Sequence, residues 1–592
     1  PLLAFLFTFL SSIICLKVRG FLEGARIFMS QFILVLLGFL AVLVLVIASA
    51  IRRKLRFKKR LAAAWGSRER VDCRPDSESS LYESFLLDEE AGTYDSLVDD
   101  QTWGDLDFFD IFQDIDTAAQ SSLGSEYLYS KLRLLHFEVD QEFDDLQSYF
   151  TQHPEVRNQL QLLFSELGKK NHNQAKKLIY KPAQANHKGS FYLFLAAIPI
   201  LSPFLYFINP SLGYIVPIIS MAFNIVYSMA TRWSLEMKLD SMGYLVRIFY
   251  IGEKIARLPL PQQASLKEAV ASFSRTRLFG EVFRPQSGAS ELEIFYLYIN
   301  SVLLIPQLAQ AYISNRLVKA NQQARQVLEI LGRLEAAIAV LNYKEILPIY
   351  AKPSFKSSTG MKGKGLYHPL LERPVSNDLD FSKNMMISGD NASGKSTYLR
   401  MAAINAILAQ GLGFACAESL TLQRGHVLSS MDVTDDIGSG DSYFIAESRA
   451  IERIIDSLEE EGLHYFFIDE LFKGTNTVER IGAGLAIIDW LAQKPCLYMI
   501  SSHDVELVAA SGQLNAQYHF DSQYVDGEIV FDYKIKQGSA LTKNAVNTLE
   551  SLNYPQEITD TAREIITAYE ASGNWSLLEK GQSKLDDKDR NG

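Results

Sequence analysis

Cysteine is scarce in this chain, and acidic residues outnumber basic ones. Its 592 residues include four cysteines, which stand far apart without a paired spacing, at Cys15, Cys73, Cys416 and Cys496. That arrangement argues against a disulfide framework and against a zinc site, and it favours a reduced, cytosolic body. The formal net charge of −11 excludes a globally basic surface for nucleic acid, although it does not exclude a local basic patch.

The length excludes a single domain, because hydrophobic cores stop growing at roughly 250–300 residues. Apolar residues at helical spacing predict an all-α core in two parts, residues 102–189 and 231–350. Residues 351–572 predict an α/β domain, and residues 573–592 a polar tail. Residues 61–101 are rich in Asp, Glu and Ser, which predicts a solvated acidic linker, with a partner-binding acidic segment as the alternative.

Long uncharged apolar runs predict membrane segments. Residues 32–50 could cross a bilayer as a helix of about 20 residues. The basic cluster at residues 52–60 should then stay on the cytoplasmic side and contact anionic lipid. Residues 190–208 and 212–230 flank a tight turn and predict a transmembrane hairpin, residues 190–230, with both ends in the cytoplasm. The alternative is a buried hairpin of a soluble domain.

The beginning of the chain is harder to interpret. Residues 1–60 are expected to form a membrane anchor, but its first apolar segment, residues 2–16, is short for a membrane span. This segment could cross together with residues 32–50, be a signal-anchor-like piece, or lie outside the natural product. Met29 directly precedes the convincing run, so we hypothesise that it is a native start.

A glycine-rich loop between an apolar run and a helical pattern carries the clearest chemistry. In such loops, backbone N–H groups and the positive end of the helix dipole hold the β- and γ-phosphates of a nucleotide. Lys395 would add a charge on the same oxygens, and the Ser396 hydroxyl would bind Mg²⁺. A glycine turn before a core helix is the alternative. The expected ATP-binding residues here are Gly389, Asn391, Ser393, Gly394, Lys395, Ser396 and Thr397.

Two later apolar strands end in residues that suit ATP hydrolysis. Residues 463–468 predict a buried parallel strand that ends at Asp469 and Glu470, beside the phosphate loop. Asp469 would hold Mg²⁺ through water, and Glu470 would polarise the attacking water. Residues 496–502 lead to His503, which can hydrogen-bond the γ-phosphate or its water, although a lone histidine is more often structural.

A Ser-Gly turn lies between the phosphate loop and the strand that ends at Asp469. The turn precedes a predicted helix and is therefore a second anion site. In its own subunit it would be redundant, so Ser439, Gly440 and Ser442 are expected to cap the nucleotide of a second subunit. The sequence therefore predicts a dimer with two composite sites.

These motifs together resemble the ATPase domain of the MutS mismatch-repair family. The similar segments keep their order over roughly residues 360–570 and are GDNASGKSTYLR at 389–400 and residues 367–370, 375–378, 439–442, 467–470, 474–477 and 502–503. The resemblance implies an ABC/MutS-type P-loop NTPase fold, ATP with Mg²⁺, Val375 beside the nucleotide, and a dimer that uses helices near residues 541–569. Residues 115–129 and 233–347 resemble, more weakly, the family's helical core domain.

Departures from the family limit what carries over. We find no counterpart of its mismatch-reading and connector domains, nor of the aromatic-x-Glu wedge that inserts beside a mispaired base. Asp441 stands where the family usually has a basic residue, and Asp390 replaces a proline in the phosphate loop. ATP hydrolysis is therefore expected to carry over, and mismatch recognition is not.

The expected protein is a membrane-anchored MutS-like ATPase at the bacterial cytoplasmic membrane, with its ATPase domain in the cytoplasm. The resemblance implies a homodimer, or a pairing with a related subunit, and binding to mismatched or branched DNA. A modest basic set fits DNA, but a solvated helix face explains it as well: Arg316, Lys319, Arg325 and Arg333. The alternative is an ATP-driven machine that remodels a membrane complex, or transports a substrate, without binding DNA.

Overall fold

The structure, a computed structural model, describes residues 37, 40–41, 43–71, 73–92, 94–182, 188–283, 291–357, 360–390, 392–431, 443–525, 528–539, 546, 549–550, 552, 554–573 and 575. It divides into two compact units, residues 1–65 and 66–592. In the first unit residues 43–64 are helical, and Val44, Leu45 and Val46 have exposed side chains. The segment at residues 2–16 and Met29 lie outside the described residues, as does much of the run at 32–50.

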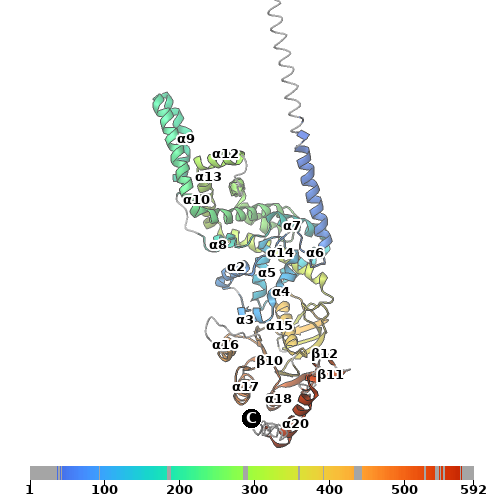
Figure 1. The fold of residues 1–592 in the computed structure, drawn as a ribbon. Helices are drawn as coiled ribbons and strands as arrows, with labels where there is room; N and C mark the ends of the chain where they lie inside the picture. The colour runs from blue at the N-terminus through green and yellow to red at the C-terminus, as the bar shows by residue number, and fades with distance from the viewer. Residues whose placement is uncertain are drawn as a thin grey trace, which may run out of the picture. The chain divides into compact units, whose positions relative to one another are not determined.

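The first part of the second unit is a helical core, drawn in blue to green in Figure 1. Its central helix, α14 (Asn321–Ile346), packs against α5 (Ser122–Arg133), α6 (Gln141–Gln152) and α11 (Gln263–Ala271), and it buries Leu331, Leu334 and Ile338 at helical spacing. The other elements are α2 (Glu78–Ala91), β1 (Ser96–Leu97), α3 (Asp100–Asp105), α4 (Phe108–Ile115), η1 (Asp116–Ala118), β2 (Leu134–Leu135), α7 (Pro154–Leu167), α8 (Ala175–Tyr180), η3 (Ser274–Phe283), α12 (Glu291–Val302) and α13 (Ile305–Lys319).

Part of the predicted acidic linker is a packed helix. Helix α2 lies on α5, and its Leu81 and Phe85, one turn apart, are each 1% exposed. The Phe85 ring meets Tyr129 of α5 edge-on at 6.0 Å between centroids. The structure differs here from the sequence prediction, because two apolar side chains on one face are enough to dock a short helix whose Glu83 and Glu90 stay exposed.

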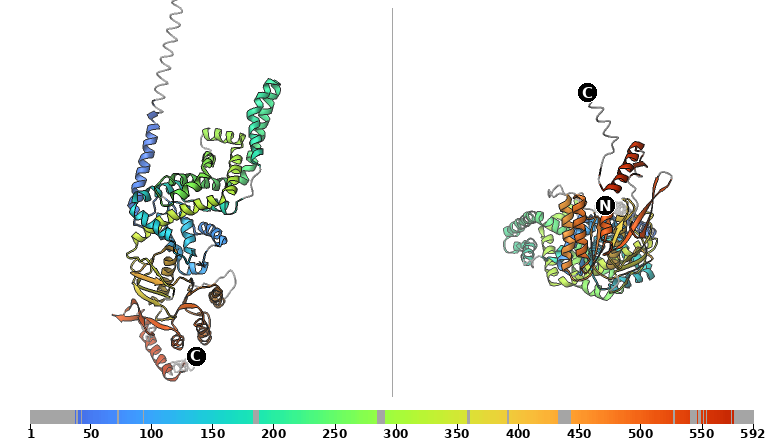
Figure 2. Two further views of the ribbon diagram at one scale, coloured as in Figure 1. Left: turned by 180° about the vertical axis from the view of Figure 1, so that it is seen from behind. Right: turned by 90° about the horizontal axis from the view of Figure 1, so that it is seen from below.

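A long helical hairpin extends from the core. It consists of α9 (Gly189–Leu201), η2 (Ser202–Phe207) and α10 (Pro210–Ile255). Figure 1 labels the hairpin next to α12 and α13, and Figure 2 shows from behind that it projects from the helical core. At its tip a Cβ on Gly213 would lie 2.5 Å from the Cα of Tyr206, so the two helices approach closely only with glycine there. The predicted boundary after residue 230 falls inside α10, a continuous helix of 46 residues that contains no proline after Pro217.

The outer part of the hairpin exposes apolar side chains. Among the described residues, two stretches, Gly189–Phe207 and Pro210–Thr231, are long and apolar enough to cross a membrane, and only 28% and 22% of their apolar windows are buried. Phe207 is 84% exposed, Ile218 67% and Phe194 63%. The hairpin is therefore not a buried element of a soluble core within this chain.

The second part of the unit is built on a six-stranded sheet with the order β12-β11-β6-β10-β9-β8. Strand β6 (Met385–Ser388) is parallel to both neighbours, β10 (Cys496–Ser502) and β11 (Ala516–Val525). Strand β9 (His464–Asp469) is parallel to β10 and to β8 (His426–Ser430), whereas β12 (Glu528–Gln537) is antiparallel to β11. A second, four-stranded sheet has the order β3 (Ser354–Phe355), β7 (Ser419–Leu422), β4 (Met361–Leu366), β5 (Asn377–Phe381).

Helices pack against the six-stranded sheet, and the carboxyl ends of its parallel strands lie at one edge. A buried cluster joins the sheet to α16 (Tyr443–Asp456), α17 (Thr477–Leu491) and α18 (Val505–Ala510). Helix α15 (Lys395–Leu412) packs on β8, β9 and β10 and also contacts α5 of the helical core. The short η4 (Ser457–Glu459) follows α16, and α20 (Gln556–Ser572) is the last described helix. The carboxyl ends of β6, β9 and β10 consequently meet at one edge, where open α/β sheets bind ligands.

Candidate functional site

The phosphate loop encloses its own lysine. Gly389 and Gly394 have φ values of 143° and 110°, and a Cβ on Gly389 would lie 2.8 Å from the Phe520 carbonyl oxygen. Lys395, the first residue of α15, donates from Nζ to the carbonyl oxygens of Gly389 (2.7 Å) and Asp390 (2.9 Å). Burial lowers the pKa of Lys395, although the nearby carboxylates oppose that effect. The loop thus holds an ammonium group at the start of a helix.

The loop also leaves one buried hydroxyl without a partner. Ser393 is fully buried, and its Oγ has no hydrogen-bond partner among the described residues. Such a group costs free energy unless a ligand or water satisfies it, so its position fits a phosphate-binding role. Thr397 is exposed on the first turn of α15, while Asn391 lies outside the described residues.

Two side chains suited to Mg²⁺ meet between α15 and β9. Ser396 donates from Oγ to Asp469 Oδ2 at 2.7 Å, and Ser501 of β10 donates to Asp469 Oδ1. A hydroxyl and a carboxylate are hard oxygen ligands, which Mg²⁺ prefers. The donor set therefore fits this ion, and Ser501, which the sequence analysis did not single out, orients the carboxylate from the neighbouring strand.

Glu470 and His503 form an ion pair at the same edge. Glu470 has a φ of 64°, and its Oε1 lies 3.0 Å from His503 Nδ1 while Lys473 Nζ lies 3.7 Å from Oε2. Burial by itself raises the pKa of Glu470, but the hydrogen bond and charge of His503, with Lys473 and Lys395, hold that pKa below its usual value. The hydrogen bond to Glu470 in turn raises the pKa of His503. Each group therefore favours the charged form of the other.

Strand β12 holds β5 and the residues just before it against the phosphate loop. Asn377 of β5 donates from Nδ2 to the Tyr533 carbonyl oxygen at 2.9 Å and accepts from the Ile535 N–H at 3.0 Å. A Cβ on Gly394 would lie 3.3 Å from Cδ1 of Tyr533, so this tyrosine covers the phosphate loop. Val375 is half-buried just before β5. Tyr533 gave no sequence signal, because it reaches the loop only through the pairing of β11 with β12.

Asp390, the residue that departs from the family pattern, has a structural partner. Its Oδ2 accepts a hydrogen bond from the Ser522 hydroxyl of β11 at 2.6 Å. The aspartate thereby ties the loop to the edge of the sheet, a role that a proline in this position could not perform.

Comparison with known proteins agrees with this geometry. The family model of MutS domain V matches residues 385–570. This part of the chain is therefore similar to MutS domain V. The DNA mismatch repair protein MutS of Staphylococcus haemolyticus is 29% identical over 240 residues, which are 38% of this chain and 27% of that protein. The protein of the same name from Thermus thermophilus is 26% identical over 272 residues, 45% of this chain and 33% of that protein. The matches thus span about a third of these relatives or less.

The MutS domain is attached to the helical core by a buried polar contact. Asp105 of α3, 4% exposed, accepts from the Ser429 hydroxyl at 2.7 Å and from the Met431 N–H at 3.0 Å. Arg453 of α16 donates to Asp99 and to the Ser429 carbonyl oxygen. These contacts hold the carboxyl end of β8, just before the predicted trans residues Ser439, Gly440 and Ser442, which lie outside the described residues.

A second contact links the other side of that segment to the catalytic edge. Glu447 of α16 is 5% exposed and accepts from the N–H groups of Lys473 (3.0 Å) and Gly474 (3.0 Å). This contact ties α16, the helix that follows residues 432–442, to the loop that carries Lys473 beside Glu470.

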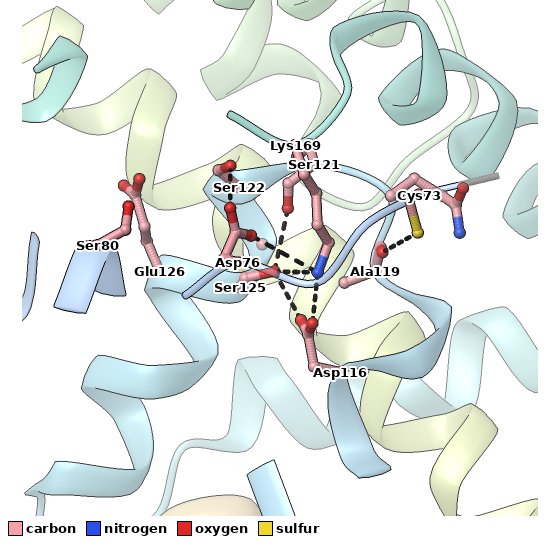
Figure 3. Close-up of polar contacts among 12 residues, drawn as sticks. Cys73, Asp76, Ser80, Asp116, Ala119, Ser121, Ser122, Ser125, Glu126 and Lys169 are labelled. Atoms are coloured by element: carbon pink, nitrogen blue, oxygen red, sulfur yellow. Dashed lines mark hydrogen bonds and ion pairs between the residues drawn. The ribbon is translucent and has the colours of Figure 1, made fainter. Parts of the chain in front are cut away.

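The MutS-like motif at residues 115–129 forms a buried charge cluster rather than a ligand site. Lys169, 4% exposed, pairs with Asp116 and lies 3.6 Å from Asp76 Oδ2, as Figure 3 shows. Ser125 donates to Asp116 Oδ1 at 2.6 Å, and Ser122 donates to Asp76 Oδ1 at 2.7 Å. The cluster fastens the segment before α2, the start of α5 and the segment after α7 to one another, which explains why this stretch is polar although it is buried.

Proposed function

We propose that this chain binds and hydrolyses ATP with Mg²⁺ as a dimer and that a membrane hairpin anchors it. The observation that carries the enzymatic part is the convergence of Lys395, Ser396, Asp469, Glu470 and His503 at the carboxyl ends of β6, β9 and β10. Each is a residue type that takes part in phosphoryl transfer.

Each side chain has a role that follows from its contacts. Lys395 exchanges the two loop carbonyls for phosphate oxygens, which are stronger acceptors. Ser396 and Asp469 hold Mg²⁺, which when bound supplies positive charge on the β- and γ-phosphate oxygens. Glu470, kept anionic by His503, accepts a hydrogen bond from the attacking water, and His503 donates toward the γ-phosphate.

The dimer part of the proposal rests on the contacts made on either side of residues 432–442, by Glu447 after them and by Ser429 and Met431 before them. Ser439, Gly440 and Ser442 of one subunit would cap the nucleotide of the other, and α16 would carry their movement to Lys473 through Glu447. The contacts of Asp105 with Ser429 and Met431 would carry it to the helical core. We propose a homodimer joined through the ATPase domains.

The membrane part rests on the exposed apolar surface of α9, η2 and α10. Side chains such as Phe207 and Ile218 would be stabilised by contact with lipid, at roughly 1.5–3 kcal/mol for each large apolar side chain that becomes fully buried. With the basic residues 52–60 on the cytoplasmic side, the sequence supports a multi-pass protein of the bacterial cytoplasmic membrane.

Two candidate functions differ in what the cycle of ATP binding and hydrolysis acts on. The first candidate is DNA, mismatched or branched, together with repair partners, and the relatives' name, DNA mismatch repair protein, supports mismatched DNA. The basic set gives DNA little support, because Arg333 pairs with Glu142 and Glu329, Arg316 donates to the Ser272 carbonyl oxygen, and Arg325 lies over the Tyr180 ring. The exposed hairpin favours the second candidate, in which ATP hydrolysis moves a membrane complex without DNA.

The deciding experiment is ATP turnover by the detergent-solubilised full chain, with and without homoduplex, mismatched and branched DNA at low and moderate salt. Stimulation by DNA that falls steeply with salt and is absent in Lys395→Ala supports the DNA candidate. Basal turnover that ignores every DNA supports the membrane candidate. Absence of turnover in the wild-type chain, or turnover equal in wild type and Lys395→Ala, contradicts the ATPase itself.

A further inference from the structure

A group of two histidines and one glutamate lies at the end of the sheet opposite the ATP site. His426 opens β8 and His464 opens β9, and the parallel register places these two residues directly beside each other. Glu460 follows η4, in the connection from α16 to β9. Because Asp469 ends the same strand that His464 begins, the group is about 17 Å from the Mg²⁺ ligands by the rise of a strand.

The polar partners of His426 are all acceptors. Its Nδ1 lies 3.0 Å from Glu460 Oε2, and its Nε2 lies 3.2 Å from the Glu461 carbonyl oxygen. A neutral imidazole can donate from only one nitrogen, so its other nitrogen faces an oxygen with its lone pair. A proton or a metal ion between Nδ1 and the carboxylate would remove that repulsion.

His464 supplies the second, independent sign of a missing ligand. It is 0% exposed, and neither of its ring nitrogens has a hydrogen-bond partner in good geometry among the described residues. Its ring stacks on His426 at 4.4 Å between centroids. An unsatisfied buried imidazole destabilises the folded state, and a bound ion would satisfy it.

We propose that His426, Glu460 and His464 bind a divalent transition-metal ion of the Zn²⁺ class. One ligand atom of each lies within 4.8 Å of the other two, and tetrahedral coordination at about 2.1 Å needs separations of about 3.4 Å. Two imidazoles with one carboxylate suit Zn²⁺, Co²⁺ or Ni²⁺ rather than Mg²⁺, which prefers oxygen alone. No cysteine takes part, which is why cysteine spacing gave no sign of this site.

Binding requires an imidazole to turn and Glu460 to move. The two rings are nearly parallel, with 16° between their planes, so one imidazole has to turn about its Cβ–Cγ bond before both lone pairs point at one ion. Glu460 has a 61% exposed side chain and can close on the ion from the solvent side. The ion would then join the far ends of β8 and β9 to the connection after α16, and thereby stabilise the helix that follows residues 432–442.

The test uses the full chain in detergent, free of nucleotide and carrying an affinity tag without histidine. After treatment with a chelator, the protein is titrated with Co²⁺ in excess Mg²⁺, and bound metal is measured by elemental analysis and by the visible absorption of tetrahedral Co²⁺. The expected result is one Co²⁺ per chain, displaced by Zn²⁺. Glu460→Gln should weaken binding at least about tenfold, since it removes a charged ligand from an exposed position without disturbing the core.

A matched control is His519→Ala, on β11. The imidazole of His519 lies 3.1 Å from Asp521, but His519 belongs to no group of three possible metal ligands among the described residues. It should bind Co²⁺ as the wild type does. The proposal is overturned if the wild-type chain retains no stoichiometric Co²⁺, or if Glu460→Gln binds it with unchanged affinity. His464→Phe, checked for folding by circular dichroism, provides a second variant that should lose the absorption band.

Discussion

The carboxylate of Asp105 lies 2.7 Å from the Ser429 hydroxyl and accepts a second hydrogen bond from the Met431 N–H. This contact joins α3 of the helical core to the carboxyl end of β8, in the MutS domain. Both side chains are buried, so the contact is shielded from water, and hydrogen bonds to a charged group contribute more there than at the surface. The helical core and the segment before residues 432–442 should therefore move as one body.

Asp105→Asn tests this connection. Both hydrogen bonds go to Oδ2 of Asp105. The amide keeps the shape of the carboxylate and one acceptor oxygen but loses the charge that strengthens both bonds, so we expect the free energy of unfolding to fall by about 2 kcal/mol. ATP turnover should fall as well, because the substitution weakens the contact that holds Ser429 and Met431, the residues just before 432–442. Turnover and denaturant unfolding of the full chain measure both effects. Asp110→Asn, an exposed position on α4, is the matched control and should change neither; equal behaviour of the two variants would refute the coupling.

Glu470→Gln should separate ATP binding from hydrolysis. The amide cannot accept the proton or orient water as an anion does, so hydrolysis should fall by about two to four orders of magnitude while ATP binding persists. Dimerisation should become stable in ATP, which size-exclusion chromatography with light scattering can detect. Normal turnover in this variant would rule out the role of Glu470.

The pH profile of kcat/KM should report the Glu470–His503 pair. The hydrogen bond with Glu470 raises the pKa of His503, so the protonated ring persists above its ordinary range and is lost as the pH rises through the raised value. We expect activity to decline on that alkaline side and expect the decline to disappear in His503→Gln, at a lower overall rate. His172→Gln, which removes an exposed His–Glu pair with Glu83 far from the site, is the control and should keep the wild-type profile.

Glu126 should make stability depend on pH. It is buried beside Ser84 and Asn173, and burial raises its pKa to about 7 from 4.5. The folded state therefore binds the proton more tightly, and stability falls as the pH rises from about 4.5 to about 7, by about 3 kcal/mol. Glu126→Gln removes this loss, so the variant should gain stability relative to wild type with rising pH. Thermal unfolding from pH 5 to pH 8 measures it; exposed Glu83→Gln serves as control, and parallel curves for Glu126→Gln and wild type would contradict the assignment.

The hairpin makes a topological prediction. If α9 and α10 cross the membrane, a cysteine in place of Ile208 at the tip, 81% exposed, should react with an impermeant maleimide from outside the cell. A cysteine in place of Leu278, 74% exposed in the helical core, should react only in inverted vesicles. Labelling above the background of the unsubstituted chain gives the result. Reaction of both positions from the same side would mean that the hairpin does not cross.

The local features of the ATP site could be predicted from sequence because each is contiguous. The phosphate loop needs small residues between a strand and a helix, and Asp469, Glu470 and His503 each follow directly after an apolar strand. The carboxyl ends of parallel strands lie at one edge of a sheet, so residues that directly follow different strands are expected to lie close together in space. The structure has the strand–loop–helix order and places Ser396 beside Asp469, while the roles of these residues in ATP hydrolysis stay predictions.

Only the tertiary structure decided the features that depend on pairing between distant segments. Tyr533 reaches the phosphate loop through the register of β11 and β12, and His426 meets His464 through the register of β8 and β9. Helix α2 was hidden by its acidic composition, since the docking of Leu81 and Phe85 depends on a partner surface that local sequence does not contain. Composition and periodicity describe what a segment prefers alone, whereas register and packing determine which side chains become neighbours.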